Sequence, residues 1–525
     1  MRSRLALFVF VAVLAIALPL YLYYGRHRWF FYDEWDFLVV RAGGSPGDLF
    51  RPHNAHWSTL PILAYRLLWR TVGLHSYVPY QVLLVMLHLT AAVLLRVVMR
   101  RADVNPWIAT AAASLFVLFG VGYQNILWAF QIGFVGSLVF GLTHLLLADH
   151  DGPVDRRDWF GLVAGTASLM CSGVGVTMIA VVGIATFARR GWRTALLHTG
   201  PPALLYLVWW VAVARDASGS SSGADVGDAV RYVSTGIAVA FDGMGQVPGL
   251  GVVFGVVLIS GAWLVWQRRA DAVVRRHVAA PAALLGGALV FLFVSAIGRA
   301  GTYGADSARA SRYLHLVAAL SLPAIAVAAD AIARRWRALK PLMVVLLLVG
   351  IPGNLRVLAD LDRKGESIDR SVFHRFYRRT MLAAPRVPLA SDVPEWVRPE
   401  PTFAREVTIG WLREGAASGR LPDPRPLDAA IEANTTLRLA LHQSTRTISS
   451  RACRPLAEPE EVRLNAGESL GIRDGAVRVI LLTDAARSPV LVYDPADGTT
   501  LEALAGPLLL RLSSGTPGRP STLCG

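Results

Sequence analysis

Three carboxylates stand close together near the start of the chain, at Asp33, Glu34 and Asp36. They follow the first long apolar run, and acidic side chains beside a bilayer are costly and often functional. Repulsion between neighbouring carboxylates suits one of them to accepting a proton in general base catalysis, and carboxylates are also ligands for divalent cations. A structural interpretation, as a helix cap or as partners of Arg26 and Arg28, stays open.

A second polar cluster follows about twenty residues later, at His53-Asn54-Ala55-His56. Two histidines three residues apart share a face only if the segment is helical. Their imidazoles could bind a metal ion, donate hydrogen bonds to a phosphate, or lie at a membrane interface. The sequence leaves these three interpretations open.

Arginines form the third candidate group, at Arg299 and in Ser311-Arg312-Tyr313. A guanidinium forms paired hydrogen bonds with phosphate oxygens, so an anionic ligand would explain an arginine outside the usual basic loops. The alternative is a long side chain that reaches the interface beside an aromatic anchor. We prefer this alternative for Arg309.

A set of amide and aromatic side chains suits sugar hydroxyls and ring faces, although a turn within an aromatic belt is the simpler interpretation. The set comprises Tyr123, Gln124, Asn125, Trp128 and Gln131.

The elements that must position these residues are membrane helices. The 525 residues are 54% hydrophobic and 17% charged, and apolar runs of about 20 residues, enough to cross a bilayer, recur along the first two thirds. We predict a polytopic α-helical membrane protein with about eleven spans, the first an uncleaved helix. The predicted spans lie near 5–24, 77–98, 106–123, 130–148, 159–172, 175–188, 195–214, 247–266, 278–297, 313–333 and 341–353.

The basic residues predict the orientation. Sixteen of them lie in five loops on one side of this scheme: Arg96, Arg100, Arg101, Arg156, Arg157, Arg189, Arg190, Arg193, Arg268, Arg269, Arg275, Arg276, Arg334, Arg335, Arg337 and Lys340. Because cytoplasmic loops collect positive charge, the N-terminus is expected inside and the C-terminus outside. The acidic and histidine clusters then face outward, in a first outer loop spanning 25–76.

Two domains are predicted, a transmembrane domain over 1–355 and an extracytoplasmic domain over 356–525. Within the first outer loop, Ser58 to Thr71 is amphipathic and predicts a helix lying in the interface. The second domain carries short β-like runs at Val477–Thr483, Val490–Tyr493 and Leu508–Leu512, which predict an α+β or β-rich fold. Asp484, Asp494 and Asp497 are interpreted there as turn residues.

Three cysteines occur in the chain. Cys171 lies within an apolar run, which predicts a packing role. If the C-terminal domain is outside the membrane, Cys453 and Cys524 are candidates for one disulfide bond that closes a loop of about 70 residues.

This arrangement resembles the C-type membrane glycosyltransferases that use polyprenyl-phosphate sugars. That superfamily includes protein O-mannosyltransferases, aminoarabinose transferases of lipid A and arabinofuranosyltransferases. The resemblance covers the architecture of about residues 1–355, and Asp33-Glu34 is similar to the acidic pair in the first outer loop of those enzymes. The "DEWDF … HNAHW" pattern also resembles uncharacterised bacterial members.

The resemblance implies roles for the candidate residues. Asp33 would be the general base that deprotonates the acceptor hydroxyl, Glu34 would support it or help to bind a cation, and Asp36 would be supporting. The lipid phosphate would be bound by residues from the other groups: His53, Asn54, His56, Arg299, Arg312 and Tyr313. A divalent cation is a possible cofactor, with Asp33, Glu34, His53 and His56 as its candidate ligands.

The expected reaction moves a sugar from a polyprenyl-phosphate donor to a hydroxyl of a cell-envelope glycan, lipid or protein. Alternatives are a surface-polysaccharide polymerase or ligase, a lipid-linked-sugar flippase or other transporter, and a structural scaffold. The arginine-rich, lysine-poor composition indicates a GC-rich bacterial genome, and hence a bacterial plasma membrane. Despite the net charge of +15, we expect no nucleic-acid partner, because no basic face, binding motif, P-loop or dinucleotide fingerprint occurs.

Overall fold

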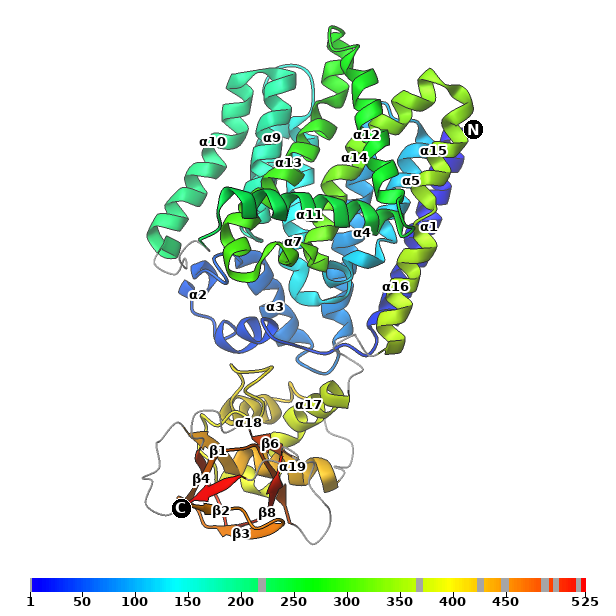
Figure 1. Ribbon diagram of the computed structural model, residues 1–525. Coiled ribbons are helices and arrows are strands. Elements are labelled where there is room, and N and C mark those ends of the chain that lie inside the picture. The colour runs from blue at the N-terminus through cyan, green and yellow to red at the C-terminus, as the bar shows by residue number, and fades with distance from the viewer. Residues whose placement is uncertain are drawn as a thin grey trace. The chain divides into compact units, whose positions relative to one another are not determined.

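The protein is largely helical. The structure, a computed structural model, describes residues 2–215, 223–364, 372–422, 429–444, 453–482, 491–493, 500–515 and 521–525 (Figure 1). Contacts divide the chain into two compact units. Unit 1 comprises Met1–Arg28, Gly44–Tyr65 and Val78–Glu366, and unit 2 comprises Trp29–Gly43, Arg66–Tyr77 and Ser367–Gly525. Two segments of the predicted first outer loop, including the acidic cluster, therefore pack with the C-terminal region.

The helices of the first two thirds of the chain carry most of the apolar residues. They are α1 (Arg2–Gly25), α2 (Gly47–Phe50), α3 (Thr59–Thr71), α4 (Val78–Arg101), α5 (Pro106–Val117), α6 (Gln124–Leu127), α7 (Ile132–Ala148), α8 (Arg156–Leu169), α9 (Val174–Arg190), α10 (Trp192–Trp209), α11 (Val226–Gly245), α12 (Leu250–Trp266), α13 (Ala272–Tyr303), α14 (Ser311–Arg335), α15 (Lys340–Leu348) and α16 (Ile351–Lys364). The segment 59–71, predicted to be an amphipathic helix, is helical as α3.

Local capping chemistry explains several helix starts. Asp155 begins α8 with a capping box completed by Asp158, and Asp225 begins α11 in the same way. These carboxylates accept hydrogen bonds from backbone N–H groups that have no partner within the first turn. Asn105 caps α5, where Pro106 occupies the first turn and needs no N–H partner.

Seven helices among the described residues are long and apolar enough to cross a membrane, or eight if α11 and α12, bent by 107° at a break, count as one span. The prediction of about eleven is therefore corrected by this criterion. Four of the predicted spans do not qualify by themselves. Three of these are helices α5, α8 and α9, with 12, 14 and 17 residues. At 1.5 Å per residue even the longest reaches only about 26 Å, short of a hydrocarbon core of about 30 Å. The fourth, near 247–266, is α12 of the bent pair.

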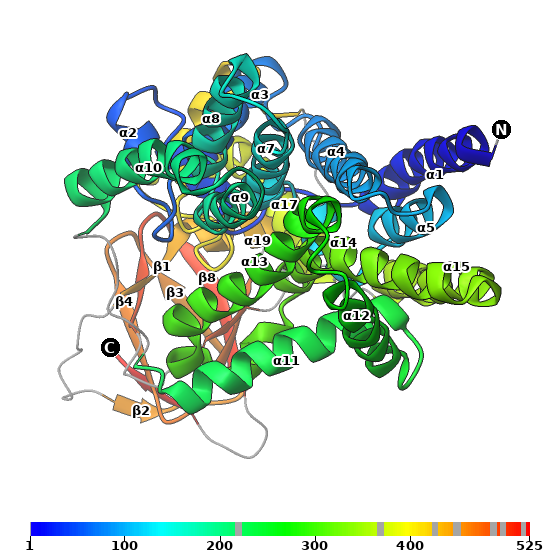
Figure 2. The ribbon, with the colours of Figure 1, turned by 90° about the horizontal axis from the view of Figure 1, so that it is seen from above.

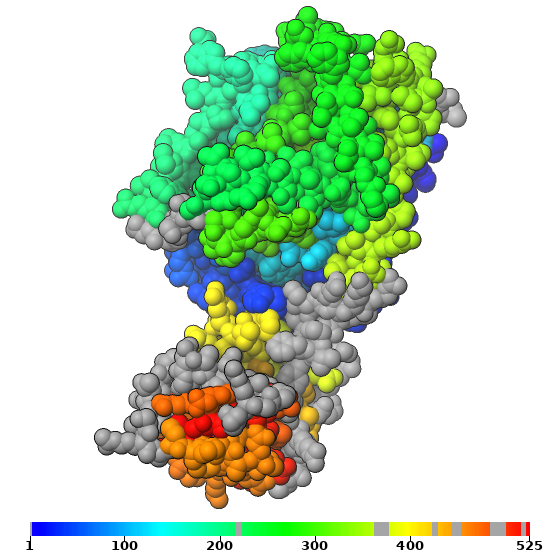
Figure 3. All heavy atoms as spheres, viewed as in Figure 1, coloured from blue at the N-terminus to red at the C-terminus, as the bar shows by residue number. Residues whose placement is uncertain are grey.

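Within unit 1 the long helices stand side by side, whereas α11 lies across them and α12 stands upright after the bend (Figures 1 and 2). The space-filling view shows α11 covering part of one face of the unit (Figure 3). The most enclosed span is α14, 89% buried within its most apolar window. Its small and branched apolar residues lie in the main hydrophobic core.

Unit 2 ends in a region with two antiparallel sheets. Its described elements are α17 (Val372–Ala383), α18 (Ile409–Ala417), α19 (Ala429–Ala440), β1 (Leu441–Ser444), β2 (Cys453–Pro455), β3 (Glu460–Leu464), β4 (Ser469–Arg473), β5 (Val477–Leu481), β6 (Leu491–Tyr493), β7 (Thr500–Ala503), β8 (Leu508–Ser514) and β9 (Thr522–Cys524). The strand orders are β1-β7-β4-β9-β2 and β3-β8-β5-β6. All three predicted β-like runs contain a strand, and Val477 and Val479 of β5 are buried on either side of exposed Arg478, as period-2 patterning requires.

Cys453 and Cys524 form a disulfide bond with a sequence separation of 71, and they are directly paired across β2 and β9. This is the pair that the sequence offered. Cys171 is free and buried, in accord with a packing role.

Candidate functional site

The acidic cluster lies in unit 2 on a tight turn that its own side chains close. Glu34 is fully buried and accepts two hydrogen bonds, from the backbone N–H of Phe31 at 2.9 Å and from the hydroxyl of Tyr77 at 3.1 Å. A carboxylate used in this way holds the turn together. Its burial makes Glu34 a positioning residue for its neighbour and leaves it out of contact with solvent.

Asp36 is also tied into the fold. It begins a π-helical turn, Asp36–Val40, and its carboxylate accepts a hydrogen bond from Arg41 Nε at 2.6 Å. The buried guanidinium of Arg66 donates in turn to the carbonyl of Arg41 at 2.6 Å. These contacts tie the Asp36 carboxylate into the fold of the turn.

Asp33 stands at the tip of this turn and is partly exposed. Arg405 lies within electrostatic reach of Asp33 and Asp36, and the salt bridge of Arg405 to Glu406 is the main cause that raises the pKa of its guanidinium. Of the three acids, Asp33 therefore combines a fixed backbone with access to a ligand, as a general base requires.

The residue before Asp33 is strained. Tyr32 has φ of +46°, a left-handed conformation that is unusual for a bulky residue and costs on the order of 1–3 kcal/mol. Its N–H donates to the carbonyl of Phe403 at 3.2 Å, and its own carbonyl accepts from Trp35 at 3.0 Å. The strained residue is thus held on both sides by backbone hydrogen bonds.

The histidine cluster lies in unit 1 and forms a two-residue turn instead of a helix. The backbones of His53 and His56 exchange hydrogen bonds of 2.9 and 2.8 Å, and Asn54 and Ala55 between them have φ of +46° and +63°. The amide of Asn54 lies 3.0 Å from His53 Nε2. His53 and His56 are therefore paired across a tight hairpin turn. A helix would have brought them together in a different way, by placing residues three apart on one face.

His56 contacts the N-terminus of α9, since a Cβ placed on Gly173 would lie 2.9 Å from His56 Nδ1. Burial is the main cause that lowers the pKa of His56 to about 4, and electrostatic interactions with His53, Arg299 and Arg312 contribute in the same direction. The imidazole is therefore neutral near pH 7. The same interactions place the two sequence-predicted arginines in the electrostatic environment of the histidine turn.

The two arginines lie against aromatic rings. The guanidinium carbon of Arg312 is 5.0 Å from the centre of the Tyr313 ring, and that of Arg299 is 5.7 Å from the same ring. Gln124 accepts from the backbone and the side chain of Arg312 at 3.4 Å. Among the described residues, no carboxylate lies within salt-bridge distance of Arg299 or Arg312. We call His53, His56, Arg299 and Arg312 the basic cluster.

A buried network holds the start of α14 in place; it joins Asn125, named in the sequence analysis, to His88 and His315, which that analysis missed. Asn125 donates to the carbonyl of Arg312 at 2.9 Å and lies 3.2 Å from His315 Nδ1, while His315 Nε2 is 3.0 Å from His88 Nδ1. His88 is also 3.1 Å from the carbonyl of Val117. Histidines inside apolar runs were the available signal, because ionisable residues at such positions are rarely accidental.

A second missed network ties together α7, α8, α9 and α10. Asp158, fully buried, pairs with Arg190 at 2.5 Å and His198 at 2.9 Å, and His198 lies 2.9 Å from His144. His150 lies 3.2 Å from Asp158. Each of the four helices contributes at least one member.

Within this network, His150, Asp155 and Asp158 are the one group of described residues with at least three His, Cys, Asp or Glu ligand atoms within 4.8 Å of one another. Arg190 neutralises Asp158, so the group fits a structural clamp better than a cation site. In the part of the chain that the structure describes, neither the acidic pair Asp33 and Glu34 in unit 2 nor the histidines of the turn in unit 1 belong to such a group.

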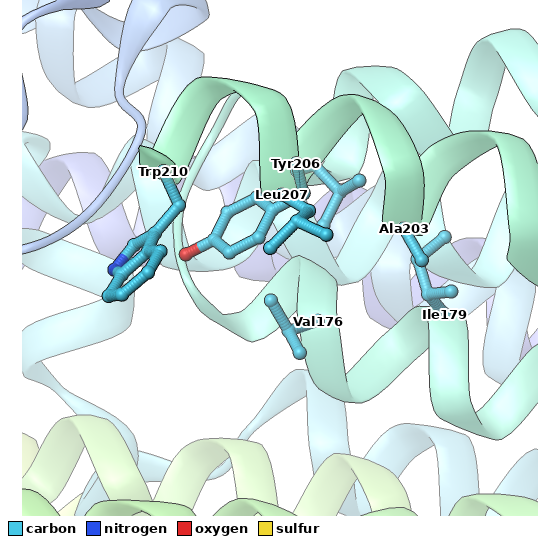
Figure 4. A pocket seen from close by; sticks show the side chains of 7 residues that line it. Val176, Ile179, Ala203, Tyr206, Leu207 and Trp210 are labelled. Atoms are coloured by element: carbon cyan, nitrogen blue, oxygen red, sulfur yellow. The ribbon is translucent and has the colours of Figure 1, made fainter. Parts of the chain in front are cut away.

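An apolar groove of about 410 Å³ runs between α9 and α10 (Figure 4). It is lined by Leu169, Val176, Ile179, Ala203, Tyr206, Leu207 and Trp210. Figure 4 shows the rings of Tyr206 and Trp210 at one end and Ala203 and Ile179 at the other.

Aromatic packing links the groove to the segment that follows the histidine turn. Tyr206 packs on a small cluster in which Trp209 and Trp57 stack with ring centroids 5.3 Å apart. Trp57 directly follows His56 in the chain, and Val176 lies on α9 one turn beyond Gly173. The histidine turn and the apolar groove are thus linked within unit 1 through Trp57 and Tyr206.

Comparison with protein-family models, curated proteins and solved structures finds no match to this chain. Asp484, Asp494 and Asp497 lie outside the described residues.

Proposed function

We propose that this protein is a membrane glycosyltransferase that takes a sugar from a polyprenyl-phosphate donor. The observation that carries the proposal is the basic cluster: two arginines without a carboxylate partner among the described residues, next to two histidines and an apolar groove. An amphiphilic anion satisfies both parts. Its phosphate would offset the charge of Arg299 and Arg312, and its hydrocarbon tail would fill the groove.

In the proposed reaction, Asp33 accepts the proton of an acceptor hydroxyl while the hydroxyl oxygen attacks the anomeric carbon. The bond between that carbon and the phosphate oxygen breaks, and polyprenyl phosphate leaves with the bonding electrons. Arg299 and Arg312 stabilise the charge that develops on the phosphate, and a single displacement inverts the anomeric centre. A divalent cation near the phosphate would act in the same sense.

The proposed location is a bacterial plasma membrane, with the N-terminus inside and the acidic turn and C-terminal domain outside. The loop arginines support this orientation. The disulfide bond supports an oxidising compartment for the C-terminal domain. The seven long apolar helices, an odd number of spans, would place the two termini on opposite sides of the membrane, whereas counting α11 and α12 as one further span would place them on the same side.

A polymerase or ligase of surface polysaccharide would also bind a lipid-linked sugar with arginines. The acidic turn favours simple sugar transfer, since Asp33 is held as an accessible base. A flippase would move the lipid without cleaving it, so consumption of the donor separates the two classes.

The decisive experiment incubates the purified protein with a panel of polyprenyl-phosphate sugars and measures which one is converted to polyprenyl phosphate. We expect one donor to be consumed by the parent protein. Transport of an intact donor across vesicles without cleavage would contradict the proposal.

A further inference from the structure

Tyr32 has two properties that stability alone would select against. Its φ of +46° lies where asparagine or glycine is far better tolerated, and 47% of its surface is exposed despite the aromatic ring. A residue that combines a disfavoured backbone conformation with an exposed aromatic ring usually belongs to a functional site.

The ring of Tyr32 is nevertheless held in place. Its centroid lies 4.0 Å from that of Phe31 and 5.4 Å from that of Phe403, and the Phe31 and Phe403 rings stack on each other at 5.3 Å. Backbone hydrogen bonds to Phe403 and from Trp35 fix the main chain on either side. The exposed part of the ring is therefore a rigid surface.

Polar groups adjoin this surface within unit 2. Asp33 is the next residue and is partly exposed, and Arg405 lies within electrostatic reach of it. A rigid aromatic face beside a carboxylate and a guanidinium matches a sugar ring, which offers a C–H face to the aromatic ring and hydroxyls to the charged groups. A peptide in extended form would instead favour a free strand edge or backbone partners.

We propose that Tyr32 is the platform on which the acceptor sugar ring stacks, so that the acceptor of the transfer is a carbohydrate. The inference rests on the proposed function and extends it by naming the class of acceptor. Stacking on Tyr32 would hold one acceptor hydroxyl against Asp33 and thereby set which hydroxyl is glycosylated.

Two variants separate the ring from the backbone strain. Tyr32→Asn removes the ring but suits the left-handed conformation, and Tyr32→Trp keeps an aromatic face. With a soluble oligosaccharide acceptor, Tyr32→Asn should raise the acceptor KM about fivefold to tenfold, with donor KM unchanged, because an aromatic contact contributes about 1 kcal/mol. Tyr32→Trp should stay near the parent value. Trp396→Ala, which removes another ring that is 53% exposed in unit 2, is the matched control and should change nothing.

Direct binding distinguishes this inference from the proposed function. Full-length protein in detergent is titrated, without donor, with gluco-, manno-, galacto- and arabino-oligosaccharides, and contacts are measured by saturation-transfer NMR. If one oligosaccharide series binds and Tyr32→Asn weakens that binding, the inference is supported. This holds even if no donor is ever consumed; the lack of donor consumption would refute only the transferase proposal. Absence of binding by every series, an unchanged acceptor KM in Tyr32→Asn, or transfer to peptide acceptors alone would overturn it.

Discussion

At the scale of single residues, three neighbouring carboxylates have three different environments. Glu34 is buried and closes the turn, Asp36 pairs with Arg41, and Asp33 is left partly exposed at the tip. In the proposed reaction the proton therefore goes to Asp33, while Glu34 and Asp36 hold its backbone.

Asp33→Asn should lower kcat for sugar transfer by about 10²- to 10⁴-fold, the usual contribution of a general base. The amide keeps the shape of the side chain but cannot accept the proton. Donor affinity and the thermal midpoint should stay at parent values, which equilibrium binding and scanning calorimetry measure. Parent-like transfer by this variant would mean that Asp33 is not the base.

Arg312→Gln should raise the donor KM about 10- to 100-fold, because hydrogen bonds to charged groups contribute about 1.5–3 kcal/mol each. The control is Arg309→Gln in the preceding loop, since Arg309 is exposed and already pairs with Asp306 at 2.8 Å. Steady-state kinetics with varied donor distinguishes them. Equal effects of the two substitutions would argue against a phosphate site at Arg312.

At the scale of elements, the start of α9 meets the histidine turn. Gly173 has φ of −59° and ψ of −16°, so alanine suits its backbone, yet a Cβ there would lie 2.9 Å from His56 Nδ1. The glycine is required by the imidazole that it faces, and not by the conformation of the chain.

Gly173→Ala should therefore displace the His56 ring and weaken donor binding several-fold, while kcat and helical content stay unchanged. Gly255→Ala in α12 is the control, because nothing lies within 4 Å of the added Cβ. Donor titration and circular dichroism provide the two measurements. Unaltered donor affinity in Gly173→Ala would remove His56 from the site.

At the scale of the whole molecule, the chain returns to complete a unit that it began early. Residues 29–43 and 66–77 pack with the C-terminal residues from 367 onward. The buried contact of Trp35 Nε1 with the hydroxyl of Tyr377, at 2.6 Å, joins residues 342 positions apart. The turn that carries Asp33 thus depends on the integrity of unit 2.

Replacing both Cys453 and Cys524 by serine should destabilise unit 2 by about 4 kcal/mol, the loop-entropy value for a closed loop of this length. Chemical denaturation followed by tryptophan fluorescence measures the change, and Cys171→Ala in unit 1 serves as a comparison. Sugar transfer should be lost at a lower denaturant concentration than in the parent. An unchanged unfolding midpoint would show that the bond contributes little.

The sequence by itself determined the features that depend on composition and local pattern. Apolar runs predicted a helical membrane protein because a bilayer accepts only chains with satisfied backbones, and period-2 alternation predicted strands such as β5. The sequence-based prediction overestimated the number of spans that meet the length criterion. Apolar composition does not reveal where helices such as α5 and α8 end, and both are too short to qualify.

Only the tertiary structure decided which residues share an environment. The sequence could not reveal that Phe403 holds Tyr32, or that Asn125 and His88 support the start of α14 through His315, because long-range contacts leave no periodic signal. Nor could spacing distinguish Glu34 from Asp33, because adjacent carboxylates look alike in a sequence; only the structure shows that Glu34 is fully buried and Asp33 partly exposed.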